Sequence, residues 1–124
     1  MANKAIIEVN TYGSYQQRGL DVARRFDTGE SLPAADFHLV FPSMASLFAE
    51  LPPKRLQTLD TLKAMGPASI YALAKKLGRN YSNVHRDIER LLEHSLVAKD
   101  ETNRVFVPWS AVEIHLAAEP AMAA

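Results

Sequence analysis

Apolar side chains in the first part of the chain recur with the two spacings that distinguish strands from helices. They alternate with polar side chains over residues 4–10 and again over residues 37–41, and this alternation predicts two short strands. Between them, from about residue 14 to residue 28, apolar residues recur at helical spacing, and Gly29 follows where a helix commonly ends. The pattern therefore predicts a β-α-β arrangement at the start of the chain.

A short helix is expected directly after the second strand, which Pro42 ends. Ser43 can cap the first turn of this helix, because a serine oxygen accepts a hydrogen bond from an otherwise unpaired backbone N–H. The residues that the helix is expected to bury are Met44, Leu47 and Phe48. Residues 1–50 are therefore expected to form a β-α-β-α extension that serves dimerisation or partner binding.

The middle of the chain, residues 51–110, carries three consecutive helical repeats. The first covers residues 53–65, the second residues 70–77 and the third, after a three-residue link, about residues 82–94. A Gly-Pro pair ends the first repeat and Gly78 ends the second, as is usual for helix C-termini. The repeats predict a compact group of three helices.

A polar turn between two short apolar runs follows the third helix. Residues 96–98 and residues 104–107 predict the strands of a hairpin, and residues 99–103 predict its turn. Three helices followed by a two-stranded hairpin form the order of the winged helix-turn-helix. The predicted fold class is therefore α+β, a winged helix-turn-helix over residues 51–110 with an N-terminal β-α-β extension.

The last segment, residues 111–124, begins with renewed alternation over residues 112–116. A strand is the preferred prediction, and a helix is the alternative because alanine-rich sequence also favours helices. The Ala-rich tail that follows is interrupted by Pro120 and is expected to be frayed.

The distribution of charge matters more than its total. The 124 residues hold 14 Lys+Arg and 14 Asp+Glu, so the formal net charge is zero. Residues 53–110, however, combine 10 basic with 6 acidic side chains. Because local charge governs what a surface attracts, this block is compatible with a nucleic-acid partner, although a similar excess is also common on a solvated surface.

Signals for catalysis are poor. The chain has no cysteine, which excludes disulfides, Cys-ligated zinc and thiol nucleophiles. Its four histidines lack metal-ligand spacing, and its glycines form neither a phosphate-binding loop nor a nucleophile elbow. We therefore expect a protein that is not an enzyme and needs no cofactor or metal. The absence of a membrane-length apolar run and of a signal-peptide pattern predicts a cytoplasmic location.

The third helix carries the residues expected to read DNA. An α-helix fits the major groove of B-DNA, and its N-terminal residues usually enter the groove first. Arginine can pair with guanine and asparagine with adenine through two hydrogen bonds, whereas serine and histidine offer single bonds. The predicted base contacts are Ser82, Asn83, His85 and Arg86. The alternative is a hydrated helix face on which these side chains meet only neighbours such as Glu89.

Contacts to the DNA backbone are expected around that helix, because phosphate contacts dominate such interfaces. The candidates are Ser69, Tyr71, Lys75, Lys76, Arg79, Asn80, Tyr81 and Arg90. On the hairpin, Asn103 and Arg104 are expected to probe the minor groove or the backbone. The alternative for Asn103 is a turn residue chosen for its tolerance of positive φ. Asp87 is expected to be structural, in an ion pair with Lys54, Arg55 or Lys63.

Several stretches resemble a family of small prokaryotic MarR-like winged-helix transcriptional regulators. The resemblance spans roughly residues 37–116, and its most specific part is residues 80–87. The stretches that carry it are Leu51-Pro-Pro-Lys-Arg-Leu-Gln, Gly66-Pro-Ala-Ser-Ile-Tyr-Ala-Leu-Ala, Gly78-Arg-Asn-Tyr-Ser-Asn-Val-His-Arg-Asp-Ile and Val105-Phe-Val-Pro-Trp. Members commonly look like products of two-gene operons similar to toxin–antitoxin modules. The resemblance thus implies autoregulation and a small co-encoded protein partner.

Two functions are consistent with the sequence. The first is a homodimeric, sequence-specific DNA-binding autorepressor, in which the segments outside residues 51–110 supply dimerisation, with a strand exchanged between subunits as one option. A dimer is expected because specific affinity normally needs two half-sites about 34 Å apart. The alternative is an antitoxin-like interaction module that neutralises a co-encoded protein, with DNA binding secondary. In that case residues 1–36 or the C-terminal strand would clamp the partner.

Overall fold

The computed structural model describes residues 3–9 and 36–116. The helix predicted over residues 14–28 and the Ala-rich tail lie outside the described residues. The chain divides into two units, one formed by residues 1–47 and 110–124 and the other by residues 48–109. The sequence predicts three consecutive segments, whereas here the residues that follow the hairpin belong to the same unit as the start of the chain.

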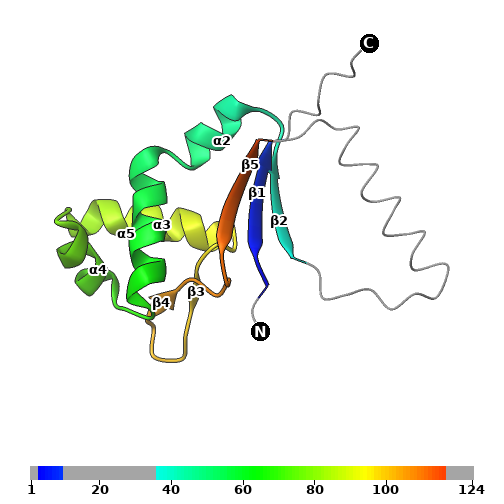
Figure 1. The fold of residues 1–124 in the computed structure, drawn as a ribbon. Helices are drawn as coiled ribbons and strands as arrows, with labels where there is room; N and C mark the ends of the chain where they lie inside the picture. The colour runs from blue at the N-terminus through cyan, green and yellow to red at the C-terminus, as the bar shows by residue number, and fades with distance from the viewer. Residues whose placement is uncertain (1–2, 10–35, 117–124) are drawn as a thin grey trace, which may run out of the picture. The chain divides into compact units, whose positions relative to one another are not determined.

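The described part of the first unit is a three-stranded parallel sheet with the order β2-β1-β5 (Figure 1). Its strands are β1 (Ala5–Val9), β2 (Phe37–Phe41) and β5 (Val112–Leu116). Both pairings of the central strand are parallel, and Ala5 lies between Phe37 of β2 and Val112 of β5. The preference for a strand over residues 112–116 is confirmed. This strand pairs with β1 of its own chain.

The alternation of side chains along these strands separates the sheet into an apolar and a largely polar face. Residues that pair in a parallel ladder point to the same side. One face therefore carries only apolar residues, namely Ala5, Ile7, Val9, Phe37, Leu39, Phe41, Val112, Ile114 and Leu116. The other face carries polar pairs, including His38 with Glu8 at 3.1 Å and Lys4 with Glu113 at 3.0 Å.

Helix α2 (Met44–Glu50) begins at the predicted serine cap. The Ser43 hydroxyl accepts a hydrogen bond from the Ser46 N–H at 3.1 Å. Of the three residues expected to be buried, only Leu47 is, whereas Met44 and Phe48 remain 43% and 47% exposed. That part of the prediction was wrong. Around a helix, Met44 and Phe48 are turned about 60° and about 100° away from Leu47, so a narrow buried stripe leaves them out.

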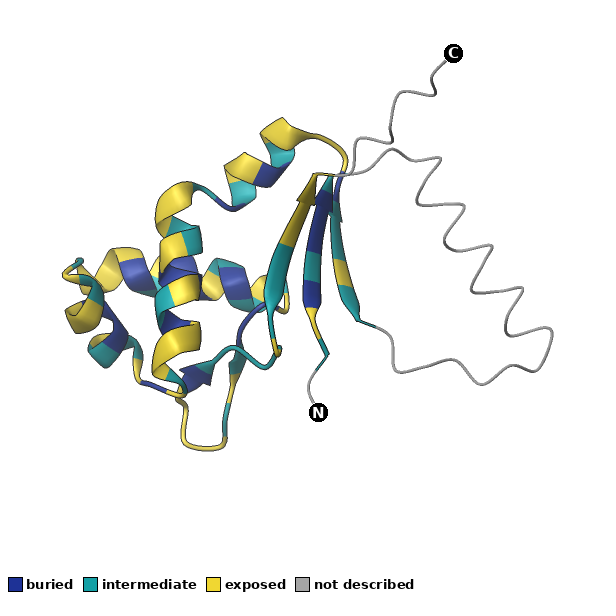
Figure 2. Ribbon diagram, in the orientation of Figure 1, coloured by how far each residue is buried: buried dark blue, intermediate teal, exposed yellow. Residues whose placement is uncertain are grey.

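The second unit contains the three predicted helices and the hairpin. Its elements are α3 (Pro53–Met65), α4 (Ile70–Leu77), α5 (Tyr81–Glu93), β3 (Ala98–Lys99) and β4 (Val105–Phe106). Apolar residues from the helices, the segments that join them and the hairpin form its core, and Figure 2 draws the buried positions in dark blue. The fully buried ones include Leu51, Leu62, Leu73, Val84, Ile88, Leu91, Leu96 and Val105.

Local signals set the boundaries of these helices. The Ser69 hydroxyl caps α4 by accepting from the Ala72 N–H at 3.0 Å, and Gly78 ends it with φ of 65°. The Asn80 side chain then accepts from the Ser82 N–H at 2.8 Å. Because Asn80 is the cap, α5 begins at Tyr81, one residue before the predicted start.

The hairpin is shorter than predicted, and it has an additional partner. β3 starts at Ala98, because the buried Leu96 and Val97 still hydrogen bond to the end of α5 through the Leu91 carbonyl. Ala68 pairs antiparallel with Val105, through reciprocal backbone bonds of 3.0 and 2.9 Å. Sequence reasoning missed this bridge, because a single residue between two helices shows no periodicity.

Candidate nucleic-acid interface

Helix α5 presents two chemically different faces. Its buried face consists of Val84, Asp87, Ile88 and Leu91. The exposed residues on its N-terminal half are Tyr81, Ser82, Asn83 and Arg86, and Figure 2 draws exposed positions in yellow. A helix with one apolar and one polar face packs through the first and leaves the second available.

Three of the four predicted base-contacting residues lie on the exposed face. These are Ser82, Asn83 and Arg86, whereas His85 is intermediate in exposure. Arg86 lines two shallow depressions. It shares one with Asn83 and the start of α3, and the other with Ser82 and His85. Within the described chain, neither the Asn83 amide nor the Arg86 guanidinium has a hydrogen-bond or ion-pair partner, so both remain available to a ligand.

His85 interacts with its helix neighbours. Its Nδ1 lies 2.8 Å from a carboxylate oxygen of Glu89, and its ring centroid lies 5.8 Å from that of Tyr81. For His85, this agrees with the alternative prediction, in which the side chains of this helix face contact only neighbours such as Glu89. Glu89 would lie beside any nucleic acid on this face and would disfavour a nearby phosphate.

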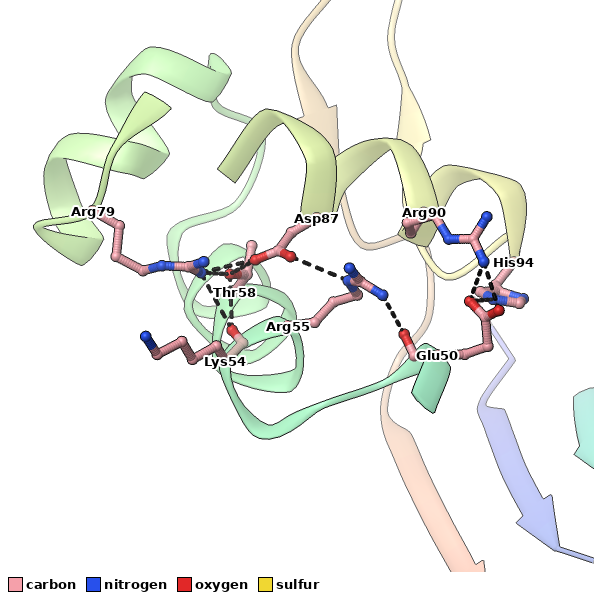
Figure 3. Close-up of polar contacts among 8 residues, drawn as sticks. All are labelled: Glu50, Lys54, Arg55, Thr58, Arg79, Asp87, Arg90 and His94. Carbon is pink, nitrogen blue, oxygen red and sulfur yellow. Dashed lines mark hydrogen bonds and ion pairs between the residues drawn. The ribbon is translucent and has the colours of Figure 1, made fainter. Parts of the chain in front are cut away.

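Asp87 lies at the buried end of an ion-pair cluster that joins three parts of the second unit (Figure 3). Its carboxylate accepts hydrogen bonds from Arg55 Nε at 3.1 Å and from Arg79 Nη1 at 2.8 Å. The Thr58 hydroxyl donates to it at 3.1 Å and accepts from Arg79 Nη1 at 2.8 Å. The Asp87 side chain is only 9% exposed. Such burial of a charge is tolerated because two guanidinium groups and a hydroxyl compensate it.

This cluster refines the expectations for its members. Asp87 is structural and pairs with Arg55, one of its three predicted partners, while its pairing with Arg79 was missed. Arg79 was predicted to contact DNA phosphates, but its Nη1 is bound within the cluster and its side chain is 21% exposed. Its role in the described structure is to fix the link before α5. The position of the polar Thr58 beside buried Leu59 on α3 is the sequence signal that could have indicated the cluster.

A second cluster holds the C-terminal half of α5. Arg90 pairs through Nη2 with both carboxylate oxygens of Glu50 and through Nη1 with Glu93 at 2.8 Å. His94 Nε2 lies 3.3 Å from Glu50 (Figure 3). The hydrogen bonds from Arg90 and His94 lower the pKa of Glu50, and Glu50 in turn raises the pKa of Arg90. Because two carboxylates compensate its charge, Arg90 is a poorer phosphate contact than its sequence position indicates.

The other predicted backbone contacts fall into three groups. Ser69 and Asn80 act as helix caps. Tyr71, at 69% exposure, and Tyr81, at 50%, present exposed hydroxyl-bearing rings, and the ring of Tyr81 also lies beside that of His85. Lys75 and Lys76 are exposed in the last turn of α4, and neither has an ion-pair partner within the described chain.

On the hairpin turn, Asn103 has φ of 66°. This agrees with the alternative prediction that Asn103 is a turn residue that tolerates positive φ. Arg104 is 54% exposed and lies 3.2 Å from Asp100. Its charge is therefore partly compensated within the turn, while its side chain stays accessible.

Two features are absent from the described residues. No group of three or more His, Cys, Asp or Glu side chains there is arranged to hold a metal ion. None of the described helices combines the length and the apolar character that crossing a bilayer requires.

The chain belongs to a protein family that is defined by sequence. The family model named HVO_A0114 matches residues 50–114, just over half of the chain. The matched region contains α3, α4, α5 and the hairpin, and reaches into β5. No curated protein and no solved structure matches the chain. The family name states no activity.

Proposed function

We propose that this protein is a sequence-specific DNA-binding transcriptional regulator of the winged helix-turn-helix type. In this proposal α5 enters the major groove, and the β3–β4 hairpin contacts the adjacent backbone or minor groove. The order of α3, α4, α5 and the hairpin supports it, as does the bridge from Ala68 to Val105 that ties the hairpin to the start of α4. A helix on a rigid support is what groove binding requires.

The observation that carries the proposal is the contrast between Arg86 and Asp87. Asp87 anchors α5 through Arg55 and Arg79, so the helix is held firmly from its buried side. Arg86 lies on the exposed side with Asn83 nearby, and both lack partners within the described chain. Arginine and asparagine are the side chains best suited to reading guanine and adenine edges. Arg86 and Asn83 thus lie unpaired, within the described chain, on a helix that Asp87 holds in place. This favours a surface that recognises DNA over a surface that is only hydrated.

Lysines around this surface supply the non-specific part of binding. Lys54 lines the same depression as Arg86 and Asn83, and Lys75 and Lys76 lie on α4. Each phosphate that such a side chain neutralises releases counterions, so log K should fall linearly with log salt. Removal of one contacting lysine should reduce the salt slope by about one and should weaken binding similarly on all sequences.

The decisive experiment compares two variants on two kinds of DNA. The cognate duplex is taken from the region upstream of the protein's own gene, or from selection out of random oligonucleotides, and the competitor is random duplex. Arg86→Ala should weaken cognate binding about 10- to 100-fold, the effect of one lost bidentate base contact, and should spare non-specific binding. Lys63→Ala removes an exposed positive charge at the other end of α3 and serves as the matched control. Equal losses on both duplexes would contradict base reading by Arg86.

The proposal includes a homodimer and an autoregulatory role. A recognition unit with one helix reads one groove, so high specificity calls for two copies on half-sites about 34 Å apart. The resemblance to MarR-like regulators supports repression of the protein's own operon. The antitoxin-like alternative stays a prediction, since residues 10–35, most of the segment it assigns to partner binding, lie outside the described residues. Its test is co-purification of a small co-encoded protein that is lost when residues 1–36 are deleted.

A further inference from the structure

Among the described residues, no strand pairs with the outer edge of β5. β5 is an outer strand of the described parallel sheet, and its inner side pairs with β1. All five of its residues, Val112–Leu116, are in unbroken register with β1, so no bulge twists the edge away. The strand also contains neither proline nor lysine, the residues that commonly blunt an edge. Its outward backbone groups therefore have no strand partner in residues 3–9 and 36–116, and they can template another strand.

The positions of the free backbone groups follow from the ladder. The Ala5 N–H donates to the Ala111 carbonyl at 2.9 Å, while Ala5 itself lies opposite Val112. In a parallel pair, alternate residues of each strand bond to the same neighbour. Glu113 and His115 therefore bond to β1. The residues whose N–H and C=O groups point to the open edge are Val112, Ile114 and Leu116.

We infer that β5 pairs antiparallel with β5 of a second copy of this chain, with the two-fold axis at Ile114. In this register the open-edge groups of Ile114 meet those of the partner's Ile114. Those of Val112 meet the groups of the partner's Leu116, so every outward N–H and C=O finds a partner. A shift by one residue would place outward groups against inward ones and lose the ladder. The two sheets then form one continuous sheet.

The side chains are complementary in the same register. On the apolar face, Val112 meets the partner's Leu116 and Ile114 meets itself, which covers residues that are otherwise 43% (Ile114) and 57% (Leu116) exposed. On the other face, Glu113 lies opposite the partner's His115. These two residue types already bind each other within one chain, at 2.8 Å. A carboxylate opposite an imidazole is favourable, whereas like charges directly opposite are destabilising. Charge complementarity therefore favours a second copy over an unrelated strand.

A five-residue edge makes a modest interface, so the free protein should dimerise weakly and reversibly, with the dimer fraction rising with protein concentration. The inference deepens the proposed function, because a two-fold protein is what a palindromic operator selects. Its evidence nevertheless comes from the sheet alone. If the protein does not bind DNA, the pairing of β5 with a second copy is not contradicted. If β5 does not pair with a second copy, DNA binding by α5 is not contradicted.

Cross-linking tests the register directly. The chain has no cysteine, so an introduced thiol reports only on its own position. Residues in a hydrogen-bonded antiparallel pair have Cα atoms about 5.5 Å apart, within disulfide range. Ile114→Cys should therefore give a disulfide-linked dimer under mild oxidation. Val112→Cys should not, because the two copies would lie roughly 13 Å apart along the strands. The double variant Val112→Cys with Leu116→Cys should cross-link again. Equal cross-linking of all single variants, or none by Ile114→Cys, would overturn the register.

Sedimentation of the full chain tests the interface itself. Ile114→Pro removes an outward N–H, and the two-fold axis doubles the effect. Loss of two hydrogen bonds should raise the dimer dissociation constant about thirtyfold. Val40→Pro removes the corresponding outward N–H on the β2 edge and should leave dimerisation unchanged. Circular dichroism checks that both proline variants fold. If one of them does not fold, the cross-linking of the cysteine variants decides whether β5 pairs with a second copy. A wild-type chain that stays monomeric across the concentration series would overturn the inference, as would equal effects of the two prolines.

Discussion

The Nη1 atom of Arg79 lies 2.8 Å from a carboxylate oxygen of Asp87, across the turn that joins α4 to α5. The same carboxylate binds Arg55 of α3, so one acidic side chain of α5 contacts both α3 and the link that follows α4. The direction in which α5 presents Arg86 and Asn83 thus depends on a buried ion pair. Stability and recognition should respond differently to neighbouring substitutions on this helix.

Asp87→Ala should strongly destabilise the protein. It leaves two partly buried guanidinium groups and the Thr58 hydroxyl without their acceptor, and breaking a buried ion pair costs about 3–5 kcal/mol. Because the Arg79 side chain is 21% exposed and water can partly replace the lost bond, we expect the lower end of that range. Urea denaturation measures the loss. Glu89→Ala, an exposed acidic residue on the same helix, is the control and should change the free energy of unfolding by less than about 0.5 kcal/mol.

Two asparagines near the start of α5 should show opposite effects. Asn80→Ala removes the cap on the Ser82 N–H and should lower the free energy of unfolding by about 1 kcal/mol. Asn83→Ala should leave stability nearly unchanged and weaken binding to the cognate duplex. Thermal unfolding and gel shifts on both variants provide the comparison. A loss of stability in Asn83→Ala equal to that in Asn80→Ala would indicate that Asn83 has a structural role.

Backbone conformation favours glycine over other residues at two positions. Gly78 has φ of 65° and ψ of 33°, and a Cβ there would meet no atom within 4 Å. The cost of Gly78→Ala is therefore that of the left-handed conformation alone, about 1 kcal/mol. Gly66 has φ of 80° and ψ of −167°, a region that is essentially restricted to glycine, so Gly66→Ala should cost up to about 3 kcal/mol. Chemical denaturation of the two variants should reproduce this order. The reverse order would contradict the conformational explanation.

The cluster around Glu50 should make stability depend on pH in the acid range. Hydrogen bonds from Arg90 and His94 lower the pKa of Glu50 below its ordinary value of 4.5. Its stabilising contribution is therefore fully present above that value and is lost as the pH falls toward the folded-state pKa. Glu50 lies near the surface, so this contribution should be about 1 kcal/mol or less.

The measurement is the free energy of unfolding between neutral pH and about pH 3, the range in which paired carboxylates titrate. Wild type should lose more stability than Glu50→Gln over this interval, because the variant has no carboxylate to protonate. Parallel curves for the two proteins would show that Glu50 does not contribute through its charge.

Much of the fold was predictable because its signals are local. Pro53 at the start of α3, the Ser69 cap of α4 and Gly78 at its end act on backbone groups within a few residues of themselves. The exposed position of Arg86 followed from helical periodicity in the same way. The exposure of Met44 and Phe48 did not, because it depends on how narrow a stripe of α2 is buried.

The amino-acid sequence by itself thus determined the helices, the strands and the exposed face of α5, since each depends on spacings of two to four residues. Only the tertiary structure decided which distant groups meet. Arg79, 8 residues from Asp87, was not among the basic residues predicted to pair with that carboxylate, and Ala68 carried no periodic signal for its bridge to Val105. The parallel pairing of β5 with β1 brings together strands from opposite ends of the chain. Such pairings depend on the simultaneous packing of all elements, because several residues of similar chemistry compete for each partner and only the folded chain selects among them.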